Sequence, residues 1–373
     1  MTKSVRELSR APTLAGETRS QWGTPVFTES VSQQVSEPAL GISARTESHI
    51  PESWAANMRP RMRGMRCALI YNPAAGTRRN RRADDVGQAA DRLRSLGHEA
   101  VVIASAGPGS AAEQAREVVR NGAQIVFACG GDGTVHEVLQ GLIARDGISP
   151  AALGIVPLGS ANALARHLRI SFDARWAVEQ QLAGERRRLS VGRLEFGDQI
   201  RYFAVMAGAG PDGALVRELQ SAGKSRLGRL AYSLQAAKIF ATRRFPCFEV
   251  EYCELDGAIR TLRAASAMAA RVSSLGGIFR GLVERRNTMD GPQLELFLLR
   301  PPALISLPLW FLTGWLGVRP LNPYLREVTV REFACRPLAE ADVDCEADGE
   351  WLGRIPMRVS VAPDALTVLL PRR

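Results

Sequence analysis

The residues Gly130-Gly131-Asp132-Gly133-Thr134 form the most informative segment of this 373-residue chain. Residues 124–129 before them predict a buried strand, and the spacing of apolar residues over 134–144 predicts a helix. Glycines in such a turn let the backbone approach a phosphate, and the N–H groups at the start of a helix bind anions. The segment therefore predicts phosphate binding, with Asp132 supplying a carboxylate for a magnesium ion or a hydroxyl proton.

Strands and helices alternate on both sides of this turn. The apolar pattern predicts strands over 67–71, 99–104 and 152–157, and helices over 85–96, 110–120 and 162–168. Strands that alternate with helices form a parallel sheet covered by helices on both faces. We therefore expect an α/β fold with a doubly wound N-terminal domain.

After Leu189 strand signals dominate, and helical spacing is confined to about 228–243. Strands are predicted over 193–196, 202–207, 248–255, 264–271, 294–299 and 327–335. These runs predict a second, largely antiparallel β domain, with the active site in the cleft between the two domains. The expected division is a disordered extension over 1–64, a first domain over 65–190 and a second over 191–373. A return of the extreme C-terminus to the first domain stays open.

Hydrophobic residues make up 46% of the chain and charged residues 23%, which is typical of a globular protein. The net charge of +10 favours anionic partners, namely nucleic acid, anionic lipid or nucleotide phosphates. Because no RNP-like, helix-turn-helix or zinc-finger pattern is present, we expect no nucleic-acid partner. The six cysteines form no CxxC pair, which argues against a metal-thiolate site and favours the reducing cytoplasm.

Residues 303–318 form an apolar run that contains Trp310, Phe311 and Trp315. The run is too short for a comfortable membrane span, and one proline and two glycines interrupt it. Two interpretations compete. The run dips into a bilayer interface, or it forms a helix packed on the β domain; packing is the preferred interpretation.

A series of short motifs follows in order along residues 65–371. The first are Ile70-Tyr71-Asn72-Pro73-Ala74-Ala75-Gly76, Gly130-Gly131-Asp132-Gly133-Thr134-Val135-His136-Glu137-Val138 and Pro157-Leu158-Gly159-Ser160-Ala161-Asn162-Ala163-Leu164-Ala165-Arg166. The later ones are Ala207-Gly208-Ala209-Gly210-Pro211-Asp212, Leu227-Gly228-Arg229-Leu230-Ala231-Tyr232, Met289-Asp290-Gly291 and Asp348-Gly349-Glu350. This series resembles the diacylglycerol kinase catalytic-domain family, which includes sphingosine kinases and bacterial lipid kinases. NAD kinases and phosphofructokinases share the glycine-rich motif but not the whole series.

The resemblance implies a two-domain fold like that of lipid kinases and NAD kinases, with a nucleotide-binding first domain and a lipid-binding second domain. It implies that ATP donates its γ-phosphate to a hydroxyl of a diacylglycerol-like or sphingoid lipid, with Mg²⁺ as cofactor. We accordingly expect a cytoplasmic enzyme of phospholipid biosynthesis that associates peripherally with the membrane surface. A homodimer stays open.

The same resemblance implies roles for individual residues. The positions that match ATP-binding residues are Asn72, Ser105, Gly130, Gly131, Asp132, Gly133, Thr134, Glu137, Ser160 and Asn162. Glu350 matches the residue that accepts the proton of the lipid hydroxyl, and Asp132 is the competing candidate. Asp290 matches a magnesium ligand, completed by backbone carbonyls near Asn287 and Pro292. That metal is expected to be structural or regulatory rather than bound with ATP.

Departures from the family pattern leave a second function open. Ala163 stands where many relatives have an Asp that helps to organise the nucleotide and metal site, and residues 284–287 replace a Pro-Ala stretch before Asp290. The alternative is a catalytically weak regulator that binds nucleotide and lipid. An NAD kinase is disfavoured by the motif at 157–162 and by the later lipid-kinase motifs. His136 neighbours the nucleotide loop but, like the other lone histidines, is expected to be structural or solvent-facing.

Overall fold

The computed structural model describes residues 64–73, 79–144, 146–221, 239, 243–275, 289–338 and 341–371. Apart from Gly64, the predicted extension over 1–64 lies outside these residues. So do most of the helix predicted over 228–243, the motif at 227–232 and Asn287.

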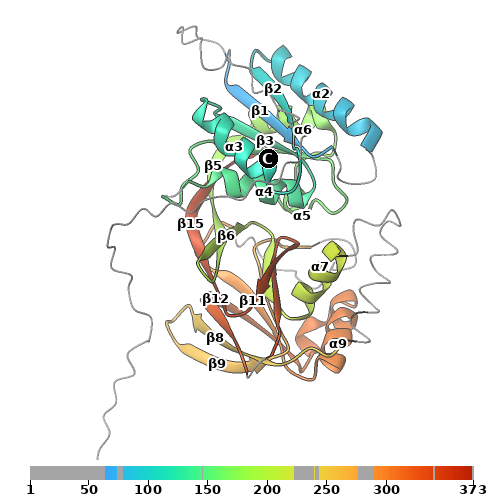
Figure 1. Cartoon of the computed structure of the whole chain (residues 1–373), viewed down its shortest axis with the longest axis vertical. Helices are drawn as coiled ribbons and strands as arrows, with labels where there is room; N and C mark the ends of the chain where they lie inside the picture. Colours follow the sequence, from blue (N-terminus) through green and yellow to red (C-terminus); the bar gives the residue numbers. More distant parts are fainter. Residues whose placement is uncertain are drawn as a thin grey trace, which may run out of the picture. The chain divides into compact units, whose positions relative to one another are not determined.

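The N-terminal part is a parallel sheet with helices on both faces (Figure 1). Its strands lie in the order β4-β3-β1-β2. The bounds are β1 (Arg66–Tyr71), α2 (Arg79–Ser95), β2 (Glu99–Ala104), α3 (Ser110–Arg120), β3 (Ile125–Gly130), α4 (Asp132–Leu142), β4 (Ala152–Pro157), α5 (Ala163–His167) and α6 (Ala174–Leu182). Alternate residues of β3 pack with α3 and α4 on one face and with α2 and α6 on the other. Every residue of β3 and β4 is buried, which explains their unbroken apolar runs.

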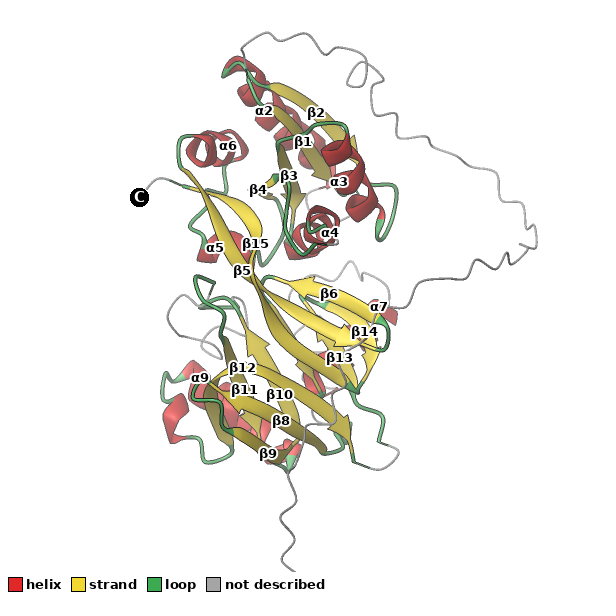
Figure 2. Cartoon of the chain, turned by 90° about the vertical axis from the view of Figure 1, so that its left-hand side faces the viewer, coloured by secondary structure: helices red, strands yellow, loops and turns green. Residues whose placement is uncertain are grey.

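The C-terminal part is a mostly antiparallel sheet in the order β14-β13-β7-β10-β11-β12 (Figure 2). The bounds are β6 (Gln199–Phe203), β7 (Met206–Ala209), α7 (Pro211–Ser221), β8 (Phe248–Glu254), β9 (Ile259–Ala264), β10 (Ser266–Ala270), β11 (Leu294–Leu299), α9 (Ala303–Trp315), η2 (Arg319–Leu321), β12 (Leu325–Pro337), β13 (Asp344–Ala347) and β14 (Glu350–Arg354). Together the two parts confirm the predicted fold class, an α/β sheet followed by a sheet-rich C-terminal part.

Strands β5 (Glu185–Phe196) and β15 (Met357–Leu370) form a long antiparallel ribbon that joins the two parts. One end of β15 pairs with β12, and the other end pairs in parallel with β4 through Val368 and Leu153. The strands of the described residues therefore belong to one sheet of fifteen. Because β15 follows β13 and β14 in the chain, the ribbon ties the turn at 348–350 to the first sheet.

Some elements differ from those predicted. Sequence analysis missed α6 and α7, and it predicted one strand over 202–207 where the structure has β6 and β7. The interruption arises because the N–H groups of Ala204, Val205 and Met206 donate to the carboxylate of Asp348, at 2.9, 2.8 and 3.0 Å. The spacing of apolar residues around 202–207 cannot indicate a hydrogen-bond partner that lies more than 140 residues later in the chain.

Arg271 follows β10 and is completely buried. Its guanidinium donates to the carbonyl oxygens of Ser190 at 2.6 Å, Gly291 at 3.2 Å and Gln293. Burial lowers the pKa of Arg271 to about 10, so the side chain stays charged at neutral pH. The buried cation therefore links β5 to the loop before β11.

Replacing Arg271 by Met leaves one buried and two partly buried carbonyl oxygens without this donor, and each such loss costs about 1–3 kcal/mol. We predict that Arg271→Met lowers the free energy of unfolding by at least about 3 kcal/mol, measured by urea denaturation. Arg354→Met is the matched control, because Arg354 is partly exposed and pairs with Asp342 at 2.7 Å. The control should change stability by less than about 1 kcal/mol. Equal effects of the two variants would contradict the role assigned to Arg271.

Candidate active site

The glycine-rich turn between β3 and α4 contacts a second loop, 157–162, at the end of β4. A Cβ atom at Gly159 would lie 2.3 Å from Gly131 Cα, and one at Gly130 would lie 2.3 Å from Thr134 Oγ1. The contact between the two loops therefore requires glycine at 159, and the packing within the turn itself requires glycine at 130. Gly131 is the N-cap of α4 and no side chain caps this helix. The N–H groups of the first turn of α4 are thus suited to bind an anion.

The residues predicted to bind nucleotide gather at the carboxyl ends of the parallel strands. Asn72 follows β1, Ser105 follows β2, and Gly130 ends β3. The chain passes from β1 to β2 on one side of β1 and then to β3 on the other side. The crevice between β1 and β3 is therefore a topological switch point, where ligands bind in open α/β sheets.

Arg82 belongs to this site and was not singled out from the sequence. Its buried guanidinium donates to the carbonyl oxygens of Asn72 and Leu158, both at 3.0 Å. It therefore connects the loop after β1 to the loop after β4. The cluster of basic residues at 78–82 is visible in the sequence, but nothing in it distinguishes Arg82 from the other arginines.

Asn162 and Glu137 have different surroundings. Asn162 has a φ of 50°, and its side chain bonds the N–H and the carbonyl of Gly159 at 3.0 and 2.8 Å. It thereby shapes the 157–162 loop, on which Ser160 is exposed. Glu137 instead accepts the N–H of Ala111, at the start of α3, at 3.3 Å. The structure therefore places Asn162 beside the glycine turn and directs Glu137 toward a neighbouring helix.

The turn at 348–350 meets α4 through His136. This side chain is 2% exposed; its Nδ1 lies 3.1 Å from Asp348 Oδ2, and its Nε2 lies 2.9 Å from Glu350 Oε2. Because both ring nitrogens contact carboxylate oxygens, both must donate, which requires the imidazolium. Burial lowers the pKa of His136, but the hydrogen bonds to Asp348 and Glu350 outweigh this and raise it to about 9. A lone histidine in the sequence could not indicate this position between two carboxylates.

The two candidate proton acceptors lie in different environments. The hydrogen bond from His136 lowers the pKa of Glu350, whose side chain is 50% exposed. Burial raises the pKa of Asp132, although the N–H of Leu164 donates to its Oδ1 at 3.3 Å. Asp132 and His136 are four residues apart on α4 and so share one face of the helix. The structure thus brings both candidates to one site, with Glu350 ionised and accessible and Asp132 more enclosed.

Two buried acids, Asp212 and Glu346, lie near the turn at 348–350 and were given no role from the sequence. Burial raises the pKa of Asp212 to about 7, and burial together with the charge of Asp212 raises the pKa of Glu346. The backbone N–H groups of Asp212 and Gly213 partly oppose the rise in the pKa of Asp212. Within the described residues, neither carboxylate oxygen of Asp212 has a hydrogen bond of standard geometry. Glu346 Oε2 accepts the N–H of Gly349 at 2.8 Å and so supports the turn that carries Glu350.

The loop that contains Asp290 is occupied by guanidinium groups. Asp290 pairs with Arg187 at 3.0 Å, and the carbonyl oxygens on either side of Pro292 accept from Arg271. Across the described residues, no group of three His, Cys, Asp or Glu side chains could hold a metal ion. The metal site predicted from Asp290 and the backbone carbonyls near Asn287 and Pro292 stays a prediction, because Asn287 lies outside the described residues.

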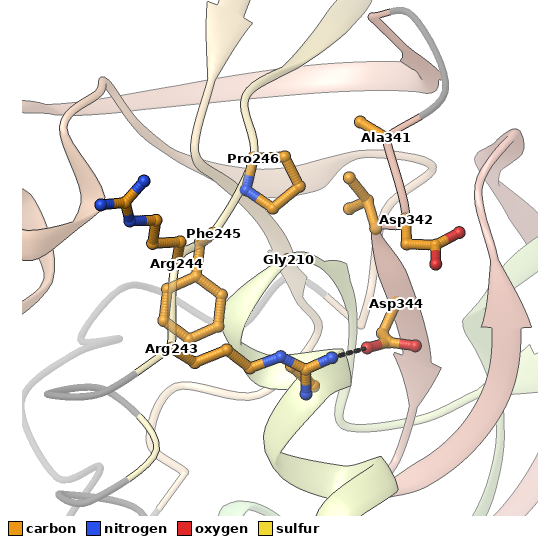
Figure 3. Close-up of a pocket in the computed structure, with 10 residues that line it drawn as sticks. Gly210, Arg243, Arg244, Phe245, Pro246, Ala341, Asp342 and Asp344 are labelled. Atoms are coloured by element: carbon orange, nitrogen blue, oxygen red, sulfur yellow. Dashed lines mark hydrogen bonds and ion pairs between the residues drawn. The ribbon is translucent and has the colours of Figure 1, made fainter.

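A pocket of about 340 Å³ lies in the C-terminal part, where 243–246 face 341–344 (Figure 3). Figure 3 shows Arg243 directed at Asp344, with which it pairs at 3.4 Å. The described residues that line this pocket include none of the predicted site residues. The candidate active site is therefore the surface around the glycine turn, not this pocket.

Known proteins resemble this chain in both sequence and fold. A family model described as the diacylglycerol kinase catalytic domain matches residues 66–194. A diacylglycerol kinase of Bacillus subtilis (strain 168) is 29% identical over 236 residues, which are 63% of this chain and 74% of that protein. One of Staphylococcus aureus (strain MRSA252) is 25% identical over 291 residues, 78% and 88% of the two chains.

The fold is also found among solved structures. The crystal structure of a diacylglycerol kinase from Bacillus anthracis aligns with a TM-score of 0.58 at 17% identity and covers 83% of this chain and 98% of that chain. The family model covers the parallel strands, the glycine turn and the 157–162 loop of the candidate active site, but not the turn at 348–350. Over residues 66–194 the chain is therefore similar to the diacylglycerol kinase catalytic domain.

Proposed function

We propose that this protein is a lipid kinase that transfers the γ-phosphate of ATP to a hydroxyl of a diacylglycerol-like or sphingoid lipid. The observation that carries the proposal is the accessible Glu350 carboxylate, held by His136 of the helix that begins at the glycine turn. A kinase that acts on an alcohol needs a proton acceptor beside its phosphate site. The relatives in Bacillus subtilis and Staphylococcus aureus are diacylglycerol kinases by name, which supports a lipid acceptor.

In this proposal the phosphates of ATP lie against the turn at 130–134, where the dipole and the N–H groups of α4 favour negative charge. Asn72, Ser105 and Ser160 provide polar groups at the neighbouring strand ends and loop. Arg82 keeps the loops after β1 and β4 together. Phosphoryl transfer depends mainly on such positioning and on charge stabilisation, because the protein supplies little covalent chemistry.

Glu350 takes the proton of the lipid hydroxyl as the hydroxyl oxygen attacks the γ-phosphorus and the bond to the bridging oxygen of ADP breaks. The His136 imidazolium keeps Glu350 ionised and holds its orientation. Asp348 is less suited to this step, because its oxygens already accept three backbone N–H groups and contact His136. Glu350 is therefore the preferred proton acceptor.

Asp132 fits a position beside Mg²⁺ bound with ATP. Magnesium prefers one or two carboxylates together with phosphate oxygens and water, and Ala163 offers no second carboxylate. A nearby cation would favour the ionised form of Asp132, whose pKa burial raises. When bound, the ion neutralises charge on the triphosphate.

Glu350→Gln removes the proton acceptor and preserves the size of the side chain. We predict that it lowers kcat for lipid phosphorylation by about 10²–10⁴-fold. ATP affinity should change by less than about twofold, because the effect lies in the chemical step. Asp132→Asn should instead weaken the binding of ATP with Mg²⁺. Transfer of labelled phosphate from ATP to diacylglycerol and sphingosine in micelles, together with calorimetric ATP binding, checks both variants.

Other outcomes would redirect the proposal. Unchanged lipid phosphorylation by Glu350→Gln would remove Glu350 from the mechanism and leave Asp132 as the proton acceptor. ATP binding by the wild-type protein without phosphorylation of either lipid would favour a nucleotide- and lipid-binding regulator, the alternative that Ala163 suggests. Transfer of labelled phosphate to NAD in a parallel reaction would contradict the proposal that the protein is a lipid kinase.

His136→Gln keeps a hydrogen-bond donor but removes the positive charge between Asp348 and Glu350. The pKa of Glu350 should then rise toward its ordinary value, because His136 lowers it through a hydrogen bond and through its positive charge, and the variant loses the charge. We predict that the acid limb of the kcat/KM profile moves to higher pH. His167→Gln is the control, since His167 belongs to α5 and contacts Ser273 at 3.0 Å. An unshifted acid limb in His136→Gln would show that His136 does not tune the proton acceptor.

A further inference from the structure

Helix α9 lies beside the C-terminal sheet (Figures 1 and 2). Its residues are buried on one face and exposed on the other. The residues of the inner face are Ala303, Ser306, Leu307, Trp310, Thr313 and Gly314. Trp310 stacks on Phe297 of β11, with the ring centroids 6.1 Å apart. The apolar run identified in the sequence is therefore a helix anchored on β11, and its outer face needs a separate explanation.

The outer face of α9 lacks the polar residues that a helix facing water normally carries there. Its inner face contains the hydroxyls of Ser306 and Thr313, and Thr313 donates back to the carbonyl of Leu309 at 2.7 Å. Its outer face is apolar throughout. The exposed residues of that face are Leu304, Ile305, Pro308, Leu312, Trp315 and Leu316.

The exposed apolar side chains are concentrated at this helix. Trp315 is 80% exposed, and Leu321, just beyond α9, is 76% exposed. Among the described residues, seven of the fifteen exposed large hydrophobic side chains lie within 304–321. Single exposed hydrophobic residues are usual on protein surfaces, but a contiguous group of this kind marks an interaction site.

A lipid bilayer suits this face better than a second protein copy does. A helix of 13 residues presents a strip of roughly 20 by 10 Å. A stable protein interface needs about 800 Å² from each partner, several times the area of this strip. An interfacial helix, by contrast, needs only an apolar face that enters the boundary between headgroups and acyl chains, where tryptophan is favoured.

We propose that the exposed face of α9 inserts into the interface of an anionic bilayer and seats the enzyme on its membrane. This proposal rests on the lipid kinase function proposed above, because a lipid substrate would reside in such a bilayer. Residues 300–326 contain three arginines and no acidic residue, which complements anionic headgroups. Two of them, Arg319 and Arg326, pair with Glu327 and Glu254 at 3.5 and 3.4 Å, so the apolar face supplies most of the binding. No helix among the described residues is long and apolar enough to cross a membrane.

The test is flotation of the full-length protein with vesicles of phosphatidylcholine and phosphatidylglycerol. The variant Leu312→Gln/Trp315→Gln changes two exposed side chains and should lower the vesicle-bound fraction by at least about tenfold in partition coefficient. Trp176→Gln is the matched control, because Trp176 is 52% exposed on α6 of the other sheet. Its binding should equal that of the wild type. Absence of vesicle binding by the wild type, or equal binding by the α9 variant and the wild type, would overturn the proposal.

Two further measurements separate this proposal from the proposed function. The α9 variant should phosphorylate a soluble short-chain diacylglycerol at the wild-type rate and lose activity on long-chain diacylglycerol in vesicles. Equal losses on both substrates would indicate general damage and overturn the proposal. If the wild type phosphorylates no lipid, the kinase proposal fails and flotation still tests α9. A dimer in sedimentation experiments that the α9 variant abolishes, without vesicle binding, would assign this face to a second copy.

Discussion

The antiparallel pairing of β5 with β15 is the constraint on which the candidate active site depends. The glycine-rich turn belongs to the N-terminal part of the sheet, whereas the Glu350 carboxylate belongs to a hairpin of the C-terminal part, and neither part alone contains both. β15 follows that hairpin directly and pairs along its length with β5 and, near its end, with β4. The backbone hydrogen bonds between β5 and β15 therefore determine how far Glu350 lies from α4. Side chains then make the direct contact between the 348–350 turn and α4.

This direct contact is electrostatic. Carboxylates from Asp132, Asp348 and Glu350 lie near α4, and like charges close together disfavour one another's ionised forms. The buried His136 imidazolium contacts two of them, and three backbone N–H groups stabilise Asp348. Glu350 keeps one strong partner and half of its surface in solvent, which leaves it able to accept a proton. The same contacts that hold the parts together thus distinguish one carboxylate from its neighbours.

Local sequence patterns predicted the first sheet well because its elements are determined by neighbouring residues. The bounds predicted for β2, α3 and β4 agree with those observed, since alternation, helical spacing and turn residues all act over a few positions. His136 and Asp348 are 212 residues apart, and Arg82 acts on a carbonyl 76 residues away. Composition and spacing do not report such partners. The family motifs indicated the ends of the strands that form the site, but the ion pair between α4 and the 348–350 turn required the structure.

The loop at Asp290 shows how a requirement for positive charge can be met by side chains. The carboxylate of Asp290 and the carbonyl oxygens of Gly291 and Gln293 lie within four consecutive residues, and each accepts from a guanidinium group. In this chain Arg271 donates to the carbonyls and Arg187 pairs with Asp290. A guanidinium has five N–H donors in a fixed plane, so it satisfies several oxygens at once and cannot dissociate as an ion does. Because Arg271 also bonds Ser190 of β5, the same cation couples this loop to the ribbon that carries the active-site hairpin.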